Sequence, residues 1–327
     1  MGLPKKLIGG AVAATAALAA ASARVRRAEP PELPPPAPGS GRHAWRHADL
    51  FYARAGSGPP ALLVHDLYAG ASGEEMAPLV ERICAELDCY SLDLPGFGRS
   101  GRPRLRYGPD LFFDAIVEFV RHEIDAPTLL VGSGLSAAYV TEAALGLGRL
   151  VAGVVLIAPP EPTGTPIIET SSWRPFAYQL LRSPLGDAYH LWRASGRRRR
   201  RLLERDLAVE PVDIEERADR LHRYASQRDA RWPLWSLWAG DLTWDPRASL
   251  SRLGAPALVI WGAEARESAV APEAYHAVRP DLAQEVVPGT ARWPHLDAPE
   301  ALAGTLLEWW AREGAIIEGT PLEAGEE

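Results

Sequence analysis

The chain has 327 residues, of which 47% are apolar, and a formal net charge of −7 at pH 7. This length permits one large domain or two ordinary ones with a sizeable core, and the negative balance excludes a general basic face for nucleic acid. The histidines and the two cysteines, Cys84 and Cys89, are not spaced as metal ligands. We therefore expect no metal, no cofactor and no nucleic-acid partner, and reduced core thiols rather than a disulfide or a metal pair.

The N-terminal segment (1–28) contains an uncharged run rich in alanine and glycine at 7–23, with Lys5 and Lys6 before it and Arg24 after it. The run is near the lower limit of the roughly 17–25 residues that span a bilayer. It predicts a signal peptide with an Ala-Ser-Ala cleavage site at 21–23 or an uncleaved membrane anchor; a soluble helical extension is a third interpretation. A proline-rich linker (29–41) follows. We expect a membrane-associated protein, or a secreted one if the segment is cleaved, rather than a cytoplasmic one.

From residue 42 onward, short apolar segments alternate with helical patterns. The expected strands are at 45–55, 61–64, 89–93, 128–131, 151–158, 257–261 and 283–287. The expected helices are at 72–87, 109–124, 271–279 and 298–312, and one starts at residue 137. Buried strands that alternate with helices predict an α/β fold with a mostly parallel sheet covered on both faces.

The alternation stops between the strands at 151–158 and 257–261, where the sequence is helical in tendency and rich in tryptophan. An insertion at this place predicts a helical cap (161–246) over the carboxyl ends of the strands, where open α/β sheets bind ligands. The core is then formed by 42–160 and 247–316, and an acidic tail (317–327) ends the chain.

The stretch 127–139 is predicted to be a strand, a tight glycine-rich turn and a helix of small residues. This is the setting of a nucleophile elbow, Gly-x-Ser-x-Gly, in which the central residue carries the attacking group. With Gly132 on the first glycine, Gly134 takes the nucleophile position and Ser136 the last small position. Glycine adopts the strained backbone of an elbow without a Cβ clash, so the turn is kept and the reactive side chain is lost.

Four further motifs follow one another in the chain: Val64-His65-Asp66, the loop 92–100 (Leu-Asp-Leu-Pro-Gly-Phe-Gly-Arg-Ser), the strand 258–262 (Leu-Val-Ile-Trp-Gly), and the loop 288–300 with Arg-Trp-Pro-His-Leu-Asp. With these motifs, residues 44–315 resemble the α/β-hydrolase superfamily, in particular its lipase- and esterase-like members with a helical cap. The resemblance implies an eight-stranded core with the cap between the sixth and seventh strands.

The family's catalytic residues do not carry over. A serine attacks, a histidine takes its proton and an acid orients the histidine. In this sequence the serine position matches Gly134, the acid position matches Ala265 and the histidine position matches Arg292. The resemblance also places the oxyanion hole near Asp66, Leu67 and Leu135. Asp66 replaces a family glycine, and an ionised carboxylate there would repel a developing oxyanion.

Displaced groups offer alternatives to these losses. Ser133 or Ser136 can be read as a shifted nucleophile, His295 as the base and Glu161 as the acid, with Glu264, Glu267 or the pair His65–Asp66 as further candidates. Each also has a structural interpretation: a helix-capping serine, a packed histidine or a solvated surface charge. A working triad requires several of the functional interpretations at once.

Two features of the predicted cap suggest partners. The arginines 197–201 form either a solvated helix face or a contact with an anionic membrane. Trp232, Trp235 and Trp238 form either core packing or the wall of a pocket for an apolar molecule or lipid. We therefore expect a catalytically degenerate member that binds an apolar ligand or partner under the cap. The alternative is a hydrolase of ester-like small molecules that uses Ser133 or Ser136 with His295.

Overall fold

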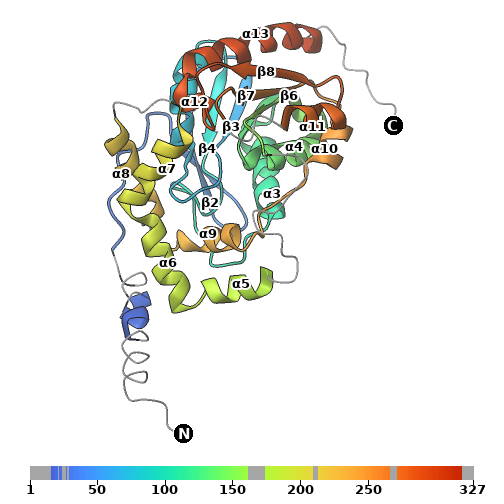
Figure 1. Cartoon of the computed structure of the whole chain (residues 1–327). Helices are drawn as coiled ribbons and strands as arrows, with labels where there is room; N and C mark the ends of the chain where they lie inside the picture. The colour runs from blue at the N-terminus through green and yellow to red at the C-terminus, as the bar shows by residue number, and fades with distance from the viewer. Residues whose placement is uncertain are drawn as a thin grey trace, which may run out of the picture.

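The computed structural model of the chain describes residues 16–20, 22–23, 27, 29–160, 174–208, 213–265 and 271–318. Its centre is an eight-stranded sheet with strand order β1-β2-β4-β3-β5-β6-β7-β8 (Figure 1). The strands are β1 (Gly41–Ala44), β2 (Asp49–Ala55), β3 (Pro60–Val64), β4 (Asp88–Leu92), β5 (Thr128–Ser133), β6 (Val151–Ile157), β7 (Ala257–Gly262) and β8 (Ala283–Val287). Only the pairings of β2 with β1 and β4 are antiparallel.

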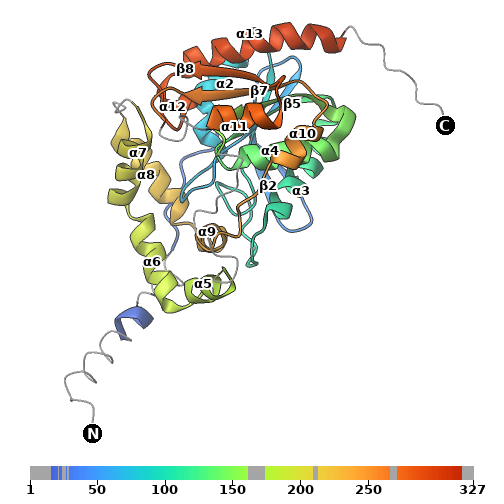
Figure 2. The ribbon, with the colours of Figure 1, turned by 45° about the vertical axis from the view of Figure 1, so that its right-hand side comes forward.

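Helices cover both faces of this sheet, as Figures 1 and 2 show from two directions. The core helices are η1 (Gly73–Met76), α2 (Ala77–Ile83), α3 (Pro109–Phe119), η2 (Val120–Ile124), α4 (Ser136–Leu147), η3 (Gly148–Leu150), α10 (Arg247–Arg252), α11 (Ala271–Val278), α12 (Pro294–Asp297) and α13 (Pro299–Glu318). One hydrophobic core lies under α2 and α13, and a larger one lies under α3 and α4. The strands β3 to β7 are almost wholly buried because both of their faces are covered.

This architecture confirms the predicted mostly parallel α/β sheet with helices on both faces. The first predicted strand is wrong in detail: the stretch 45–55 contains only β2, which pairs with the short β1 just before it in an antiparallel hairpin. The helix predicted at 72–87 begins with η1 and continues as α2, with Pro78 in the first turn of α2. Cys84 and Cys89 are free thiols.

Between β6 and β7 the chain forms a helical insertion, defined here by the helices α5 (Arg174–Leu181), α6 (Pro184–Ala194), α7 (Gly196–Asp206), α8 (Ile214–Ala225) and α9 (Arg231–Trp238). In Figure 1, α5, α6 and α9 lie at the opposite end of the molecule from α13, whereas α7 and α8 lie along its left side near α12. Arg199 of α7 is buried and donates a hydrogen bond to the carbonyl oxygen of Ala69, in the loop after β3, over 2.7 Å. The insertion is therefore anchored to the loops at the carboxyl ends of the strands.

None of the helices in the described ranges is long and apolar enough to cross a membrane. Most of the segment predicted as a signal peptide or anchor lies outside the described residues, and so do 319–327 of the predicted acidic tail. The linker predicted at 29–41 is described and contains no helix or strand before Gly41, where β1 begins.

Candidate functional site

The elbow connects β5 to α4 through Gly134, which has φ +56°. Its amide donates a hydrogen bond to the carbonyl oxygen of Ile157 on the neighbouring strand β6 over 2.9 Å. Ser136, in the first turn of α4, places its hydroxyl 2.8 Å from the carbonyl oxygen of Ser133 and 3.1 Å from that of Val64. The Ser136 hydroxyl therefore ties the helix to two strands, and the residue at the apex of the bend has no side chain.

The carboxylate of Asp66 lies in the space beside this apex. A Cβ added to Gly134 would be 2.2 Å from the Asp66 Cγ, which is far closer than two carbons can pack. Asp66 Oδ1 accepts hydrogen bonds from the amides of Leu67, over 2.7 Å, and Leu135, over 2.9 Å. These two amides are the pair that the resemblance assigns to the oxyanion hole. The structure thus brings Asp66, Leu67 and Leu135 together, and the side chain of Asp66 occupies both donors.

Arg292 holds the second oxygen of this carboxylate. It lies in the loop between β8 and α12, and its Nη2 is 3.1 Å from Asp66 Oδ2. The indole nitrogen of Trp293 is 3.5 Å from the same oxygen. Burial raises the pKa of Asp66, but Arg292 and the amides of Leu135 and Leu67 outweigh it, so the net pKa is lower than usual. Asp66 is therefore an ionised, fully buried carboxylate with its lone pairs engaged.

The third position of the predicted triad, Ala265, lies in the turn after β7, where its amide donates to the carbonyl oxygen of Gly262 over 3.2 Å. Glu264 beside it is exposed. The other acid candidates, Glu161 and Glu267, lie outside the described residues. The described part of this turn therefore presents a methyl group where the family carries a carboxylate.

The proposed rescue residues are not joined to one another. The hydroxyl of Ser133 is buried and makes no hydrogen bond, and neither ring nitrogen of His295 makes one, within the part of the chain that the structure describes. Burial lowers the pKa of His295 to about 4, so the ring is neutral. The described residues thus contain no hydrogen bond from Ser133 or Ser136 to His295, the contact that would activate a serine nucleophile.

His65 is a packed structural residue. Its Nε2 accepts the amide of Leu94 over 3.1 Å, so its Nδ1 carries the proton and donates to the carbonyl oxygen of Asp66 over 2.6 Å. Burial lowers the pKa of His65 to about 4. The ring holds the backbone of the loop after β3 and does not contact the Asp66 carboxylate in an acid–base pair.

Glu75 belongs to this cluster and was missed in the sequence. Its Oε1 accepts the amide of Asp66 over 2.7 Å, and its Oε2 accepts the hydroxyl of Tyr68 over 2.5 Å. A ring nitrogen of His295 lies 3.9 Å from Oε1. Burial is the main cause that raises the pKa of Glu75 to about 8. A usable signal existed, because Glu75, Leu79 and Ile83 are four apart, which places the glutamate on the buried stripe of η1 and α2.

The protonation of Glu75 predicts a pH-dependent difference in stability. The folded pKa of about 8 lies above the ordinary value of 4.5, so the folded protein binds one more proton between these values and loses stability as pH rises. Glu75→Gln removes this titration and keeps a similar shape. Between pH 6 and pH 8 the unfolding free energy of wild type should fall by about 2 kcal/mol more than that of Glu75→Gln, as measured by urea denaturation. The exposed control Glu86→Gln should show no such trend; a flat difference for Glu75→Gln would mean that the carboxyl is ionised throughout.

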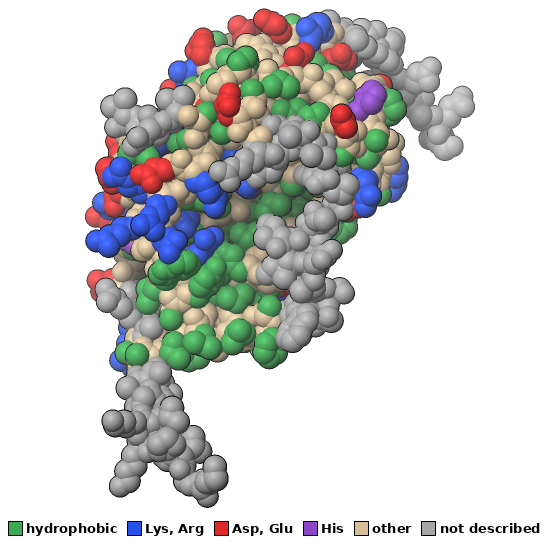
Figure 3. Space-filling view, in the orientation of Figure 1, with side chains coloured by type: hydrophobic (Ala, Val, Ile, Leu, Met, Phe, Trp, Pro, Cys, Tyr) green, Lys and Arg blue, Asp and Glu red, His purple; other side chains and the backbone are tan. Residues whose placement is uncertain are grey.

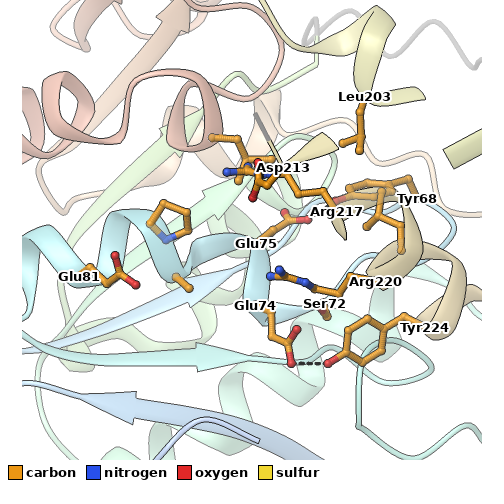
Figure 4. A pocket seen from close by; sticks show the side chains of 14 residues that line it. Tyr68, Ser72, Glu74, Glu75, Glu81, Leu203, Asp213, Arg217, Arg220 and Tyr224 are labelled. Carbon is orange, nitrogen blue, oxygen red and sulfur yellow. Dashed lines mark hydrogen bonds and ion pairs between the residues drawn. The ribbon is translucent and has the colours of Figure 1, made fainter. Parts of the chain in front are cut away.

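A pocket of about 230 Å³ opens beside Glu75, between η1 and α2 of the core and α7 and α8 of the insertion (Figure 4). We call it the η1–α8 pocket. Its apolar wall consists of Tyr68, Ala77, Pro78, Leu203, Leu221, Tyr224 and Leu296, and its polar wall of Ser72, Glu74, Glu75, Glu81, Asp213, Arg217 and Arg220. Figure 4 shows Tyr224 directed at Glu74, with which it forms a hydrogen bond. The cluster around Asp66 and this pocket thus share Glu75.

The tryptophans predicted as a pocket wall belong to one small hydrophobic cluster of the insertion, in which Trp235 is buried and Trp232 and Trp238 pack around it. Trp235 is buried against Tyr178, and Trp238 packs edge-on against Tyr189. Trp232 and Trp235 line a second cavity, but its other lining residues are Arg104, Arg182, Arg228, Asp229 and Arg231. This cavity is strongly cationic, so it suits an apolar ligand less well than the η1–α8 pocket does.

No curated protein matches the chain in sequence. Solved structures match its fold. An E-2-(acetamidomethylene)succinate hydrolase is 23% identical, with a TM-score of 0.63 over 83% of this chain and 98% of that one. A bacterial membrane phospholipase A is 18% identical, with a TM-score of 0.65 over 95% and 99%. An esterase from Exiguobacterium antarcticum is 17% identical, with a TM-score of 0.65 over 80% and 95%. At these identities the likeness concerns the fold.

The family described as "Alpha/beta hydrolase family" matches residues 61–305. That range runs from β3 through the elbow, the insertion and the Asp66–Arg292 cluster to α13. The chain belongs to the alpha/beta hydrolase family.

Proposed function

We propose that this protein is a non-hydrolytic member of the family, which keeps its site closed with its own carboxylate and binds a small apolar ligand in the η1–α8 pocket. The observation that carries the proposal is the position of Asp66, whose Oδ1 accepts both amides that would otherwise stabilise a substrate oxyanion. An ionised carboxylate there excludes the negative charge of a tetrahedral intermediate, because like charges in a buried site repel strongly.

The replacement at the histidine position fits the same interpretation. Arg292 cannot accept a proton from a nucleophile, since a guanidinium stays charged at any physiological pH. It instead neutralises Asp66. Gly134 completes the arrangement because any side chain at this point would overlap the carboxylate. The substitutions at 66, 134 and 292 are therefore mutually compatible, which is what a closed site requires.

The η1–α8 pocket is the better candidate for the ligand because tyrosine and leucine side chains form one of its walls. Its volume, about 230 Å³, limits the ligand to a small molecule. The alternative, ester hydrolysis by Ser133 or Ser136 with His295, needs a hydrogen bond that is absent among the described residues. The geometry therefore favours binding over turnover.

Filling the pocket tests the binding proposal. Leu221→Trp should weaken the binding of the uncharged fluorophore N-phenyl-1-naphthylamine at least about tenfold, because the larger ring takes the place of the ligand. Fluorescence titration of the full-length protein measures this, with thermal melting to show that the variant is folded. Trp232→Ala, in the cationic cavity, is the control and should leave the affinity unchanged. Loss of binding in Trp232→Ala alone would place the ligand in the tryptophan-lined cavity and contradict the proposal.

A further inference from the structure

Helix α6 exposes apolar side chains and buries polar ones. Leu185, Tyr189 and Trp192 follow the spacing of one helix face, and each is between 39% and 49% exposed. Asp187 and His190, on the other side of the helix, are buried. A helix at the surface of a protein in water normally has the opposite arrangement. The outward face of α6 therefore lacks the polar side chains that would suit it to water.

The preceding helix α5 extends this surface. Phe176 and Leu180, four residues apart, are 60% and 46% exposed. In the described part of the chain, the only other large apolar side chain this exposed is Val286 on β8. We call the five residues Phe176, Leu180, Leu185, Tyr189 and Trp192 the α5–α6 face. Figure 3 shows hydrophobic side chains gathered over the part of the molecule where Figure 1 places these helices. A contiguous apolar area of this kind marks an interaction surface.

Arginines border the α5–α6 face. Residues 174–201 contain eight arginines and one carboxylate, Asp187, although the whole chain has a net charge of −7. Asp187 is fully buried. Arg197 and Arg201 of α7 are exposed, and the Arg198 guanidinium lies 3.6 Å from the centre of the Trp192 ring. Figure 3 shows this basic band next to the hydrophobic patch. The surface is thus apolar with a cationic border.

The arginine run is not a uniform solvated face. Arg199 points inward to the carbonyl oxygen of Ala69, and Arg200 forms ion pairs with Glu204 and Glu215. Of the five arginines at 197–201, the three that the proposed contact uses are therefore Arg197, Arg198 and Arg201. All three lie on the helix that follows α6, close to the α5–α6 face.

The N-terminal segment meets the molecule at the same helix. The hydroxyl of Ser22 donates a hydrogen bond to Asp187 of α6 over 2.5 Å, and Ser22 is buried there. Ser22 belongs to the uncharged run at 7–23. Within the described part of that run, Ser22 therefore lies against the helix that carries most of the α5–α6 face.

We propose that the α5–α6 face docks on an anionic phospholipid bilayer. The apolar side chains enter the boundary between headgroups and acyl chains, as the apolar face of an interfacial helix does, and Arg197, Arg198 and Arg201 contact the lipid phosphates. An anionic bilayer is the occupant favoured by the combination of an apolar centre and a cationic border. In a docked protein, α5 and α6 of the helical insertion would contact the membrane, and α13 would lie on the side away from the membrane (Figure 1).

Vesicle binding by the full-length protein tests this proposal. Co-sedimentation is measured with vesicles of phosphatidylcholine and phosphatidylglycerol and with vesicles of phosphatidylcholine alone. The double variant Phe176→Ser/Leu185→Ser should lower the partition coefficient on the mixed vesicles at least about tenfold, because two apolar side chains no longer enter the bilayer. Arg197→Gln/Arg201→Gln should lower it about tenfold on the mixed vesicles only. Each variant changes exposed side chains, so the melting temperature should stay the same.

Val286→Ser is the matched control, because Val286 is 56% exposed but lies on β8, outside the α5–α6 face. It should bind vesicles as wild type does. Unchanged binding by Phe176→Ser/Leu185→Ser would show that the N-terminal segment alone carries the attachment and would overturn the proposal. Equal binding of wild type to both kinds of vesicle would also overturn it, since the arginine border would then have no role.

Discussion

Replacing Gly134 with serine should destabilise the fold by about 3 kcal/mol or more, because two costs add. A side chain at φ +56° is strained by about 1–2 kcal/mol. The added Cβ also lies 2.2 Å from the Asp66 Cγ, and overpacking of a buried site costs about 1–3 kcal/mol. Asp66 cannot easily move aside, since two amides and Arg292 hold it. Urea denaturation measures the loss.

Gly148 provides a matched control for backbone strain. Its φ is +55°, and no atom lies within 4 Å of the position of an added Cβ. Gly148→Ser should therefore lose only the cost of the strained backbone, about 1–3 kcal/mol. Asp66→Ala removes the carboxylate atoms with which the side chain introduced by Gly134→Ser clashes. The double variant should therefore lose less unfolding free energy than the two single variants lose in sum, by at least about 1.5 kcal/mol. Additive losses would mean that Asp66 does not occupy the nucleophile space. Asp66→Ala should show no coupling to Gly148→Ser.

The sheet could be predicted from the sequence because its strands carry local signals. The segments 61–64, 128–131 and 257–261 are continuous apolar runs of strand length, and burial on both faces of a parallel sheet requires such runs. The hairpin at the edge was harder to predict, since β1 is only four residues long and alternates between intermediate and exposed positions. An edge strand buries little and leaves a weak pattern.

The role of Asp66 could be predicted only in part. The sequence identifies it as an unusual acid beside the oxyanion hole. Its contacts with Leu135 and Arg292 span 69 and 226 residues of sequence, so no local pattern reports them. An isolated carboxylate suggests repulsion of a substrate anion, whereas the folded chain shows that the carboxylate itself fills the hole.

Helix geometry explains why the tryptophans could not be placed from their spacing. Successive residues of a helix are about 100° apart, so steps of three turn each side chain by about 60° relative to the last. Trp232 and Trp238 consequently differ in direction by about 120°, so their spacing alone does not say whether they line a cavity or pack together. The arginine run shows the same limit, because only the packing of α7 against the loop after β3 reveals that Arg199 is buried.

The second large effect expected is the absence of reaction with a serine-hydrolase probe. A fluorophosphonate forms a covalent bond only with a serine that a nearby base activates, and enzymes of this mechanism gain many orders of magnitude in rate from that activation. Here the apex residue is Gly134, and His295 is a neutral buried ring without a hydrogen bond among the described residues. The full-length protein should therefore react no faster than its heat-denatured form, whereas an active serine hydrolase reacts to completion.

Intact-mass spectrometry after fluorophosphonate treatment tests the central claim, that the site has no working nucleophile, most directly. We predict that the mass of the folded full-length protein does not change. A mass increase by one probe adduct that disappears in Ser133→Ala or Ser136→Ala, and also in His295→Ala, would show an assembled catalytic pair and contradict the account.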